Sequence, residues 1–146
     1  MEELRILSKI EARQINPVVL AFLGDAVYSL YVRQRLVLSG EGKAADFQRA
    51  VAKVVSAKGQ SEFLDKVLPL LTEGESDVFR RGKNAKKATK SKSATSLEYS
   101  RSTGFEAVLG YLHLTGETER INELLSIADD RDFKGIASSQ PFKPPH

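Results

Sequence analysis

The chain has 146 residues, of which 41% are hydrophobic, and it contains no cysteine. This length and composition suit one compact domain with a real core. Disulfides and thiolate metal sites are excluded, and the absence of cysteine fits a reducing compartment. The first residues, MEELRILSKIEARQ, contain no apolar signal core, and no apolar run reaches the roughly 18–20 residues that span a bilayer. We therefore expect a cytoplasmic protein without a membrane segment.

The formal net charge of +3 is distributed unevenly along the sequence. The segment from Arg80 to Arg101 contains eight Lys or Arg residues and one acidic residue, Glu98. The rest of the chain contains 14 basic and 18 acidic residues. One strongly basic segment in an otherwise slightly acidic chain indicates a polyanionic partner that binds at one place on the surface.

The first predicted helix begins with Asn16 as N-cap and Pro17 in the first helical position, and it runs to about Leu38. Its segment VVLAFLGDAVYSLYV, residues 18–32, is so apolar that we expect burial on most sides. Gly24 within this helix costs roughly 1 kcal/mol relative to alanine. We therefore predict that another backbone approaches closely at Gly24.

A second helical region is predicted from Lys43 to about Leu71, with a break near Lys58-Gly59. A short helix that ends near Gly82 follows, because Thr72 and Glu75 have capping-box spacing.

Residues 83–100, KNAKKATKSKSATSLEYS, have no apolar periodicity and predict a long exposed loop, which in a compact domain is usually functional. Helices are predicted over residues 101–116, where Gly116 ends the helix, and over residues 117–128. Residues 129–146 predict a disordered tail, so the domain is expected to cover residues 1–128. No segment alternates like a strand, which predicts an all-α fold.

Two carboxylates lie in apolar helices, Asp25 in VVLAFLGDAVYSLYV and Glu106 in GFEAVLGYLHL. An ionised carboxylate that is removed from water costs several kcal/mol unless it has a partner. These two acids could offset that cost by sharing a cation, and two carboxylates with waters form a reasonable Mg²⁺ site. Such an ion activates water and stabilises charge on a phosphate. Together with the basic segment, this pattern favours a metal-dependent phosphodiesterase.

Structural interpretations of the same residues stay open at this stage. An acid in an apolar helix can reach solvent, cap a neighbouring helix, or pair with an arginine such as Arg33 or Arg101. A lysine-rich segment can also be a solvated connector without a ligand.

The segment LAFLGDAVYSLYVR resembles the signature helix of the ribonuclease III family, roughly E-x-L-E-F-L-G-D-A-V. STGFEAVLGYLHL resembles that family's second acidic motif, D-x-F-E-A-L-x-G. The small size, the lack of a double-stranded-RNA-binding domain and the segment FRRGKNAKK are similar to the bacterial Mini-ribonuclease III subfamily, in which the catalytic domain stands alone. The resemblance covers about residues 14–128. It implies an endonuclease-domain-like helical bundle that forms a homodimer at or near the signature helix.

The resemblance also implies Mg²⁺-dependent hydrolysis of double-stranded RNA, which leaves 5′-phosphate and 3′-hydroxyl ends. For the Mini-ribonuclease III subfamily, the implied substrate is the base-paired ends of precursor 23S ribosomal RNA. The motifs imply that Asp25 is the catalytic aspartate and that Glu106 is the main metal-ligating glutamate. Two of the family's carboxylates are missing, because Ala21 and Thr103 occupy their positions. Fewer anionic ligands predict weaker metal binding and leave the number of ions open.

Double-stranded RNA is recognised largely by its shape and through phosphate and 2′-hydroxyl contacts. Without an appended RNA-binding domain, the catalytic domain itself must hold the duplex, and the basic segment is the predicted contact. The predicted RNA-binding residues are Arg80, Arg81, Lys83, Asn84, Lys86, Lys87, Lys90, Lys92, Arg101 and, as a weaker candidate, Lys58.

Two other functions remain compatible with the sequence. The missing acids at Ala21 and Thr103 favour a catalytically inactive RNA- or ribosome-binding protein with the same fold. Alternatively, the chain is a helical interaction module whose basic segment binds an acidic protein, and such a module would have no affinity for RNA.

Overall fold

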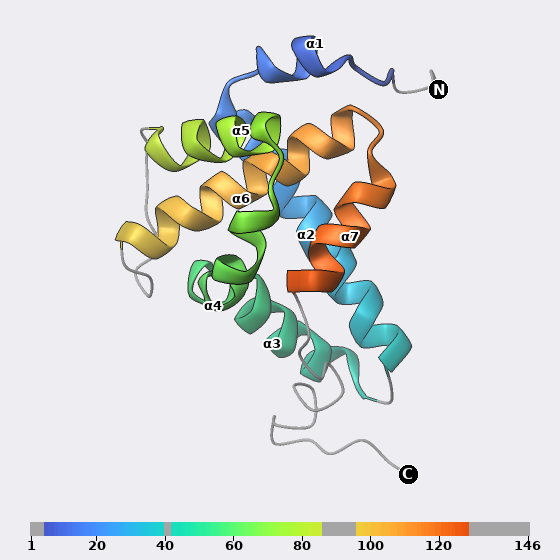
Figure 1. Cartoon of the computed structure of the whole chain (residues 1–146). Helices are drawn as coiled ribbons and strands as arrows, with labels where there is room; N and C mark the ends of the chain where they lie inside the picture. Colours follow the sequence, from blue (N-terminus) through green and yellow to red (C-terminus); the bar gives the residue numbers. More distant parts are fainter. Residues whose placement is uncertain (1–4, 40–41, 86–95, 129–146) are drawn as a thin grey trace.

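The computed structural model describes residues 5–39, 42–85 and 96–128 (Figure 1). The described elements are α1 (Lys9–Arg13), α2 (Pro17–Ser39), α3 (Ala44–Val55), α4 (Ala57–Val67), the 3-10 helix η1 (Leu68–Leu70), α5 (Glu73–Asn84), α6 (Ser96–Leu114) and α7 (Thr118–Ala128). These ranges contain no strand, so the predicted all-α helical bundle is confirmed. None of their helices is long and apolar enough to cross a bilayer. The predicted tail, residues 129–146, lies outside the described residues.

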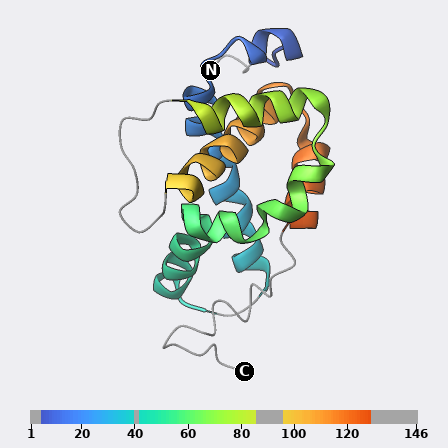
Figure 2. The same ribbon diagram turned by 60° about the vertical axis from the view of Figure 1, so that its left-hand side comes forward.

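Helix α6 is the central element of the bundle. Every residue from Ser102 to Leu112 is buried except Glu106. A helix that is buried on all sides must be covered by several neighbours. Figures 1 and 2 show α6 crossing the middle of the bundle, with α5 above it, α4 below it and α2 behind it. Its most extensive contact is with α2, followed by α5 and then α4.

Helix α2 begins and ends close to the predicted positions. The backbone N–H of Val18 donates to Oδ1 of Asn16 at 2.8 Å, which confirms Asn16 as the N-cap. The expectation that α2 is buried on most sides is wrong for the chain alone. Several apolar side chains of α2 are exposed, and Phe22 is 83% exposed. The apolar composition of a helix indicates that a face must be covered, but it does not indicate which element or partner covers that face. The exposed apolar residues are Val19, Phe22, Leu30, Val37 and Leu38.

The backbones of α2 and α6 touch where the two helices cross. A Cβ atom on Gly24 would lie 1.7 Å from the carbonyl oxygen of Glu106. A Cβ atom on Gly110 would lie 2.0 Å from the carbonyl oxygen of Leu20. Only glycine fits at either position without moving a backbone, so the predicted close approach at Gly24 is confirmed. Asp25 follows Gly24 in the sequence, so the crossing places Asp25 against α6.

Two helix boundaries differ from the predictions, and one helix was not predicted. The break between α3 and α4 lies at Ser56, whose hydroxyl caps α4 by accepting the N–H of Gly59 at 3.0 Å. Helix α6 begins at Ser96 rather than at residue 101, so the end of the predicted basic loop is helical. Helix α1 was not predicted, although Ser8 and Glu11 form a capping box before it. These short segments are polar, so the apolar pattern did not predict their helical turns. Capping and packing stabilise these turns instead.

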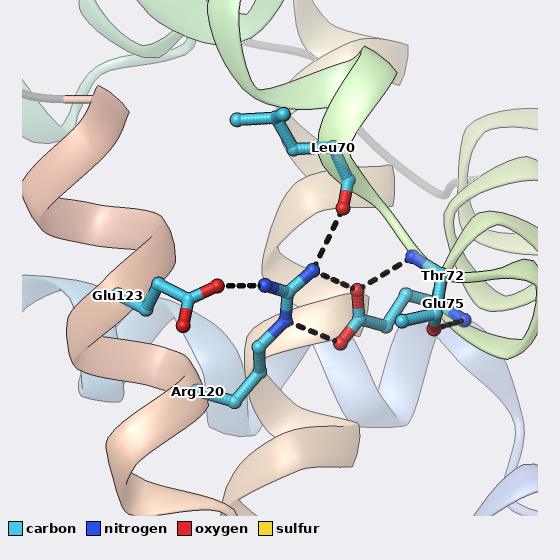
Figure 3. Close-up of polar contacts among 5 residues, drawn as sticks. All are labelled: Leu70, Thr72, Glu75, Arg120 and Glu123. Atoms are coloured by element: carbon cyan, nitrogen blue, oxygen red, sulfur yellow. Dashed lines mark hydrogen bonds and ion pairs between the residues drawn. The ribbon is translucent and has the colours of Figure 1, made fainter.

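A buried ion pair joins α5 to α7 (Figure 3). Glu75 is 4% exposed, and its carboxylate accepts Nε and Nη2 of Arg120 at 2.9 and 2.8 Å. It also accepts the N–H of Thr72 at 2.9 Å, which confirms the predicted capping box, while Arg120 donates to the carbonyl of Leu70 at 2.8 Å. Burial by itself would raise the pKa of Glu75. The hydrogen bonds from Arg120 and Thr72 more than offset it, so the pKa lies below its usual value of 4.5.

We predict that Gly24→Ala destabilises the protein by about 1–3 kcal/mol, because the new methyl group overlaps the α6 backbone. Helix propensity alone would give the opposite sign, a gain of about 1 kcal/mol. Gly74→Ala is the matched control, since its Cβ would meet only the Tyr111 hydroxyl, at 3.8 Å. Urea denaturation measures both variants. Equal stability of the two variants would contradict the backbone contact.

We predict that Arg120→Met costs about 3 kcal/mol at pH 7, because it leaves the buried Glu75 carboxylate without its cation. A depressed folded pKa stabilises the fold above pH 4.5, and this contribution is lost as the pH falls through the folded value. The difference between Arg120→Met and wild type should therefore shrink at pH 3. Urea denaturation at both pH values tests this, with Glu123→Gln as a control at the exposed end of the network. The same deficit at both pH values would show that lost packing, not charge, causes the effect.

Candidate active site

The structure brings Asp25 and Glu106 together, although they are about 80 residues apart in sequence. Asp25 follows Gly24, the residue of α2 that touches the α6 backbone at Glu106. The two carboxyl groups are close enough for Asp25 to act on Glu106 through a side-chain hydrogen bond and through its charge. The two acids that the sequence predicts to share a cation are therefore neighbours at the crossing of α2 and α6.

The two acids differ in their exposure to solvent. Asp25 is exposed in the chain alone, so the expectation of a buried aspartate is wrong at this level. Glu106 is partly buried. Burial, then the hydrogen bond and the negative charge of Asp25, raise the pKa of Glu106 to about 9, while a hydrogen bond from Gln60 acts in the opposite direction. Two close acids of this kind favour either a retained proton or a bound cation.

The arginines that could have neutralised these acids have other partners. Arg101 lies in α6, and its Nη2 pairs with Asp65 of α4 at 2.7 Å. Nε of Arg33 donates to the hydroxyl of Ser29 at 3.1 Å. The interpretation in which Arg33 or Arg101 simply balances Asp25 or Glu106 therefore has no support in these contacts.

Sequence reasoning missed Gln60 of α4, which contacts Glu106. Its side-chain Nε2 donates to Oε2 of Glu106 at 3.3 Å. A signal for this residue was available, because Gln60 precedes the buried Leu64 and Val67 by four and seven residues. That helical spacing puts Gln60 on the face of α4 that packs into the bundle.

The two positions at which the family motifs carry further acids supply no carboxylate here. Ala21 and Thr103 are both buried, and the hydroxyl of Thr103 donates to the carbonyl of Tyr99 at 2.9 Å. No cluster of three or more His, Cys, Asp or Glu side chains that could hold a metal occurs in the described part of the chain. A cation at Asp25 and Glu106 would have two carboxylate ligands and would complete its shell with water. This donor set suits Mg²⁺, which keeps several waters.

The first four predicted RNA-binding residues lie together at the end of α5. Arg80 is exposed and pairs with Asp77 at 2.6 Å, and Nη1 of Arg81 donates to the carbonyl of Arg13 at 2.7 Å. Lys83 and Asn84 follow in the last turn of the helix. Close packing of Gly82 against α6, where its Cβ would lie 3.0 Å from Cα of Gly104, fixes this end of α5 beside the central helix.

Among the other predicted RNA-binding residues, Arg101 has a described side chain. The side chain of Arg101 is 16% exposed, and its pairing with Asp65 connects α6 to α4. Lys58 belongs to α4, but its side chain lies outside the described residues, as do Lys86, Lys87, Lys90 and Lys92.

A surface hollow lies between the end of α5 and the start of α2. It is lined by Arg80, Arg81 and Asn84 from α5 and by Asn16, Pro17 and Val18 at the start of α2. Val18 and Asp25 are seven residues apart, so they lie on one face of α2 and about 10 Å apart along its axis. A polyanion in this hollow could extend along α2 to the two acids.

Comparison with known proteins defines the class of this chain. Residues 18–117, which include both acids and the end of α5, match the family described as Ribonuclease III domain. The chain therefore belongs to the ribonuclease III family, in its Mini-ribonuclease 3 group, and it is an endoribonuclease.

Two relatives show how close the similarity is. The chain is 47% identical to the Mini-ribonuclease 3 of Symbiobacterium thermophilum over 116 residues, which cover 80% of this chain and 89% of the relative. It is 44% identical to the Mini-ribonuclease 3 of Streptococcus pneumoniae over 119 residues, which cover 80% and 93%. A crystal structure of a protein from Fusobacterium nucleatum has a TM-score of 0.70 and 31% identity, and the match covers 79% of this chain and 92% of that one. The ribonuclease III-like fold predicted from the motifs is therefore confirmed.

Proposed function

We propose that this endoribonuclease cleaves double-stranded RNA with Mg²⁺, leaves 5′-phosphate and 3′-hydroxyl ends, and matures the ends of precursor 23S ribosomal RNA in the cytoplasm. The meeting of Asp25 and Glu106 at the crossing of α2 and α6 is the observation that carries the proposal. The ribosomal substrate rests on the similarity to Mini-ribonuclease 3 proteins.

Asp25 and Glu106 would hold the Mg²⁺ ion. When bound, the ion supplies an activated water and stabilises negative charge on the phosphate. Asp25 is exposed, so a phosphodiester can approach it directly, whereas Glu106 is set deeper in the bundle. The two side chains thus hold the cation between the protein interior and the RNA.

The duplex would contact the end of α5 and the face of α2 that leads to Asp25. Arg80, Lys83 and Asn84 would contact backbone phosphates or 2′-hydroxyl groups, and Arg81 is held in place by its hydrogen bond to Arg13. Lys86, Lys87, Lys90 and Lys92 continue the same basic segment in the sequence, which supports a role in binding.

The enzyme would act as a homodimer that pairs through α2. Val19, Phe22, Leu30 and Val37 are exposed apolar residues spaced along one stripe of this helix. Such a stripe on a 23-residue helix needs covering, and a second copy of α2 is chemically complementary to it. A two-fold interface would place two sites in the symmetry of the two antiparallel RNA strands.

The sequence left open an inactive RNA-binding protein with this fold, because Ala21 and Thr103 supply no carboxylate. A labelled RNA duplex incubated with the purified protein in Mg²⁺, with and without EDTA, separates the two functions. Cleavage that EDTA abolishes supports the enzyme, and binding without cleavage supports the alternative.

We predict that Asp25→Asn ends cleavage, because an amide cannot supply the anionic ligand. Asp25 is exposed, so the free energy of unfolding should change by no more than about 0.5 kcal/mol. Duplex binding without divalent metal should stay at the wild-type level. A cleavage assay, thermal melting and a binding titration test the three statements. Wild-type cleavage by this variant would remove Asp25 from the mechanism.

We predict that changing Lys83, Lys86 and Lys87 together to Ala weakens binding to duplexes of any sequence. Each lost phosphate contact flattens the dependence of log affinity on log salt by about 0.9, as on B-DNA, so the slope should change by roughly two to three. A variant with Lys43, Lys53 and Lys66 changed to Ala loses the same net charge elsewhere and serves as the control. Equal effects in the two variants would show that only net charge matters, and no effect in either would move RNA binding to another surface.

A further inference from the structure

Gln60 is a buried amide whose hydrogen bonds are only partly made. It is 1% exposed, and its Nε2 donates to the carbonyl of Val55 at 2.9 Å and to Oε2 of Glu106 at 3.3 Å. Its Oε1 is buried, and none of the described residues hydrogen-bonds to it. An unpaired buried amide oxygen destabilises the fold. Methionine, an apolar side chain of similar size, would remove this oxygen, but it would also remove the two hydrogen bonds that Nε2 donates.

The direction of this amide is determined by its surroundings. If the amide were turned over, its oxygen would face the Val55 carbonyl and the Glu106 carboxylate, which are both acceptors. The backbone at this point is also held firmly. The N–H of Gln60 donates to the carbonyl of Ser56 at 2.9 Å, and a Cβ atom on Gly59 would lie 2.4 Å from the Lys53 carbonyl oxygen. Gln60 therefore presents N–H to Glu106 from a fixed position.

A neutral donor affects Glu106 differently from a charged one. An arginine here would hold the carboxylate but would also neutralise it, as Arg120 does for Glu75. The amide of Gln60 restrains Oε2 and leaves the negative charge available for a cation. Groups that orient a metal ligand in this way strongly affect metal affinity.

We propose that Gln60 is a positioning residue, which holds the Glu106 carboxylate in the orientation that binds the divalent cation shared with Asp25. This inference rests on the proposed function, in which Asp25 and Glu106 are the metal ligands. Gln60 itself touches neither the cation nor the RNA in this role. Its unpaired oxygen is the cost of keeping an N–H donor at this position.

The test measures metal binding directly, by calorimetric titration of the full-length protein with Mn²⁺ and with Mg²⁺. Gln60→Met should weaken cation affinity by about tenfold or more. Its melting temperature in EDTA should change little, because the variant loses the unpaired oxygen together with the hydrogen bonds of Nε2. Raising Mg²⁺ should restore most of the cleavage rate. Gln60→Leu repeats the measurement with a second apolar side chain.

Ser56→Ala is the matched control for a merely structural role. It removes the N-cap of α4 and should lower the melting temperature without touching Glu106. If Ser56→Ala weakens metal binding as much as Gln60→Met does, or if both Gln60 variants bind metal like wild type, the inference is overturned.

Asp25→Asn and Glu106→Gln separate the inference from the proposed function. If these two variants lose affinity and the Gln60 variants do not, only the role of Gln60 fails. If Asp25→Asn and Glu106→Gln also keep wild-type affinity, the metal site itself is wrong, and the inference fails with it.

Discussion

The backbone contact between α2 and α6 is the constraint on which the rest of the site depends. Packed helices usually keep their axes 8–10 Å apart because side chains separate them. At Gly24 and Gly110 no side chain does so, and each glycine faces a carbonyl oxygen of the other helix. The residue after Gly24 is Asp25, so the same contact that packs the core also brings its carboxyl group to Glu106. A shift of either helix would disturb the core and the acid pair together.

Two carboxylates in the bundle, those of Glu75 and Glu106, have opposite surroundings. Glu75 pairs with a guanidinium through two charge-assisted hydrogen bonds, and its pKa is lowered. These contacts fully account for its burial. Glu106 receives another acid and one neutral amide, and its pKa is raised. The pairing of Glu75 with Arg120 shows that this fold can neutralise a buried acid with an arginine. The contrast supports the proposal that Asp25 and Glu106 hold a cation, which would supply the positive charge that the protein side chains do not.

Local sequence signals predicted much of the fold. The Asn16 cap, the Thr72 capping box and Gly116 mark helix ends through contacts within a few residues, so they could be read without the tertiary structure. The start of α6 at Ser96 could not be read, because its first turns carry no apolar pattern and depend on packing. Arg101 was placed at the start of the predicted helix for the same reason, and its contact with Asp65 emerged only when α4 and α6 were placed side by side.

The sequence by itself determined the helical class, the glycine at the crossing and the two unusual acids, because composition, period and motif are local properties of the chain. Only the tertiary structure decided that Asp25 is exposed while Glu106 is set deeper, and that one face of α2 stays uncovered in the single chain. It also identified Gln60, whose amide contacts an acid 46 residues away. Burial, pKa and hydrogen bonding depend on which helix faces which, and that is fixed by long-range packing of the whole bundle.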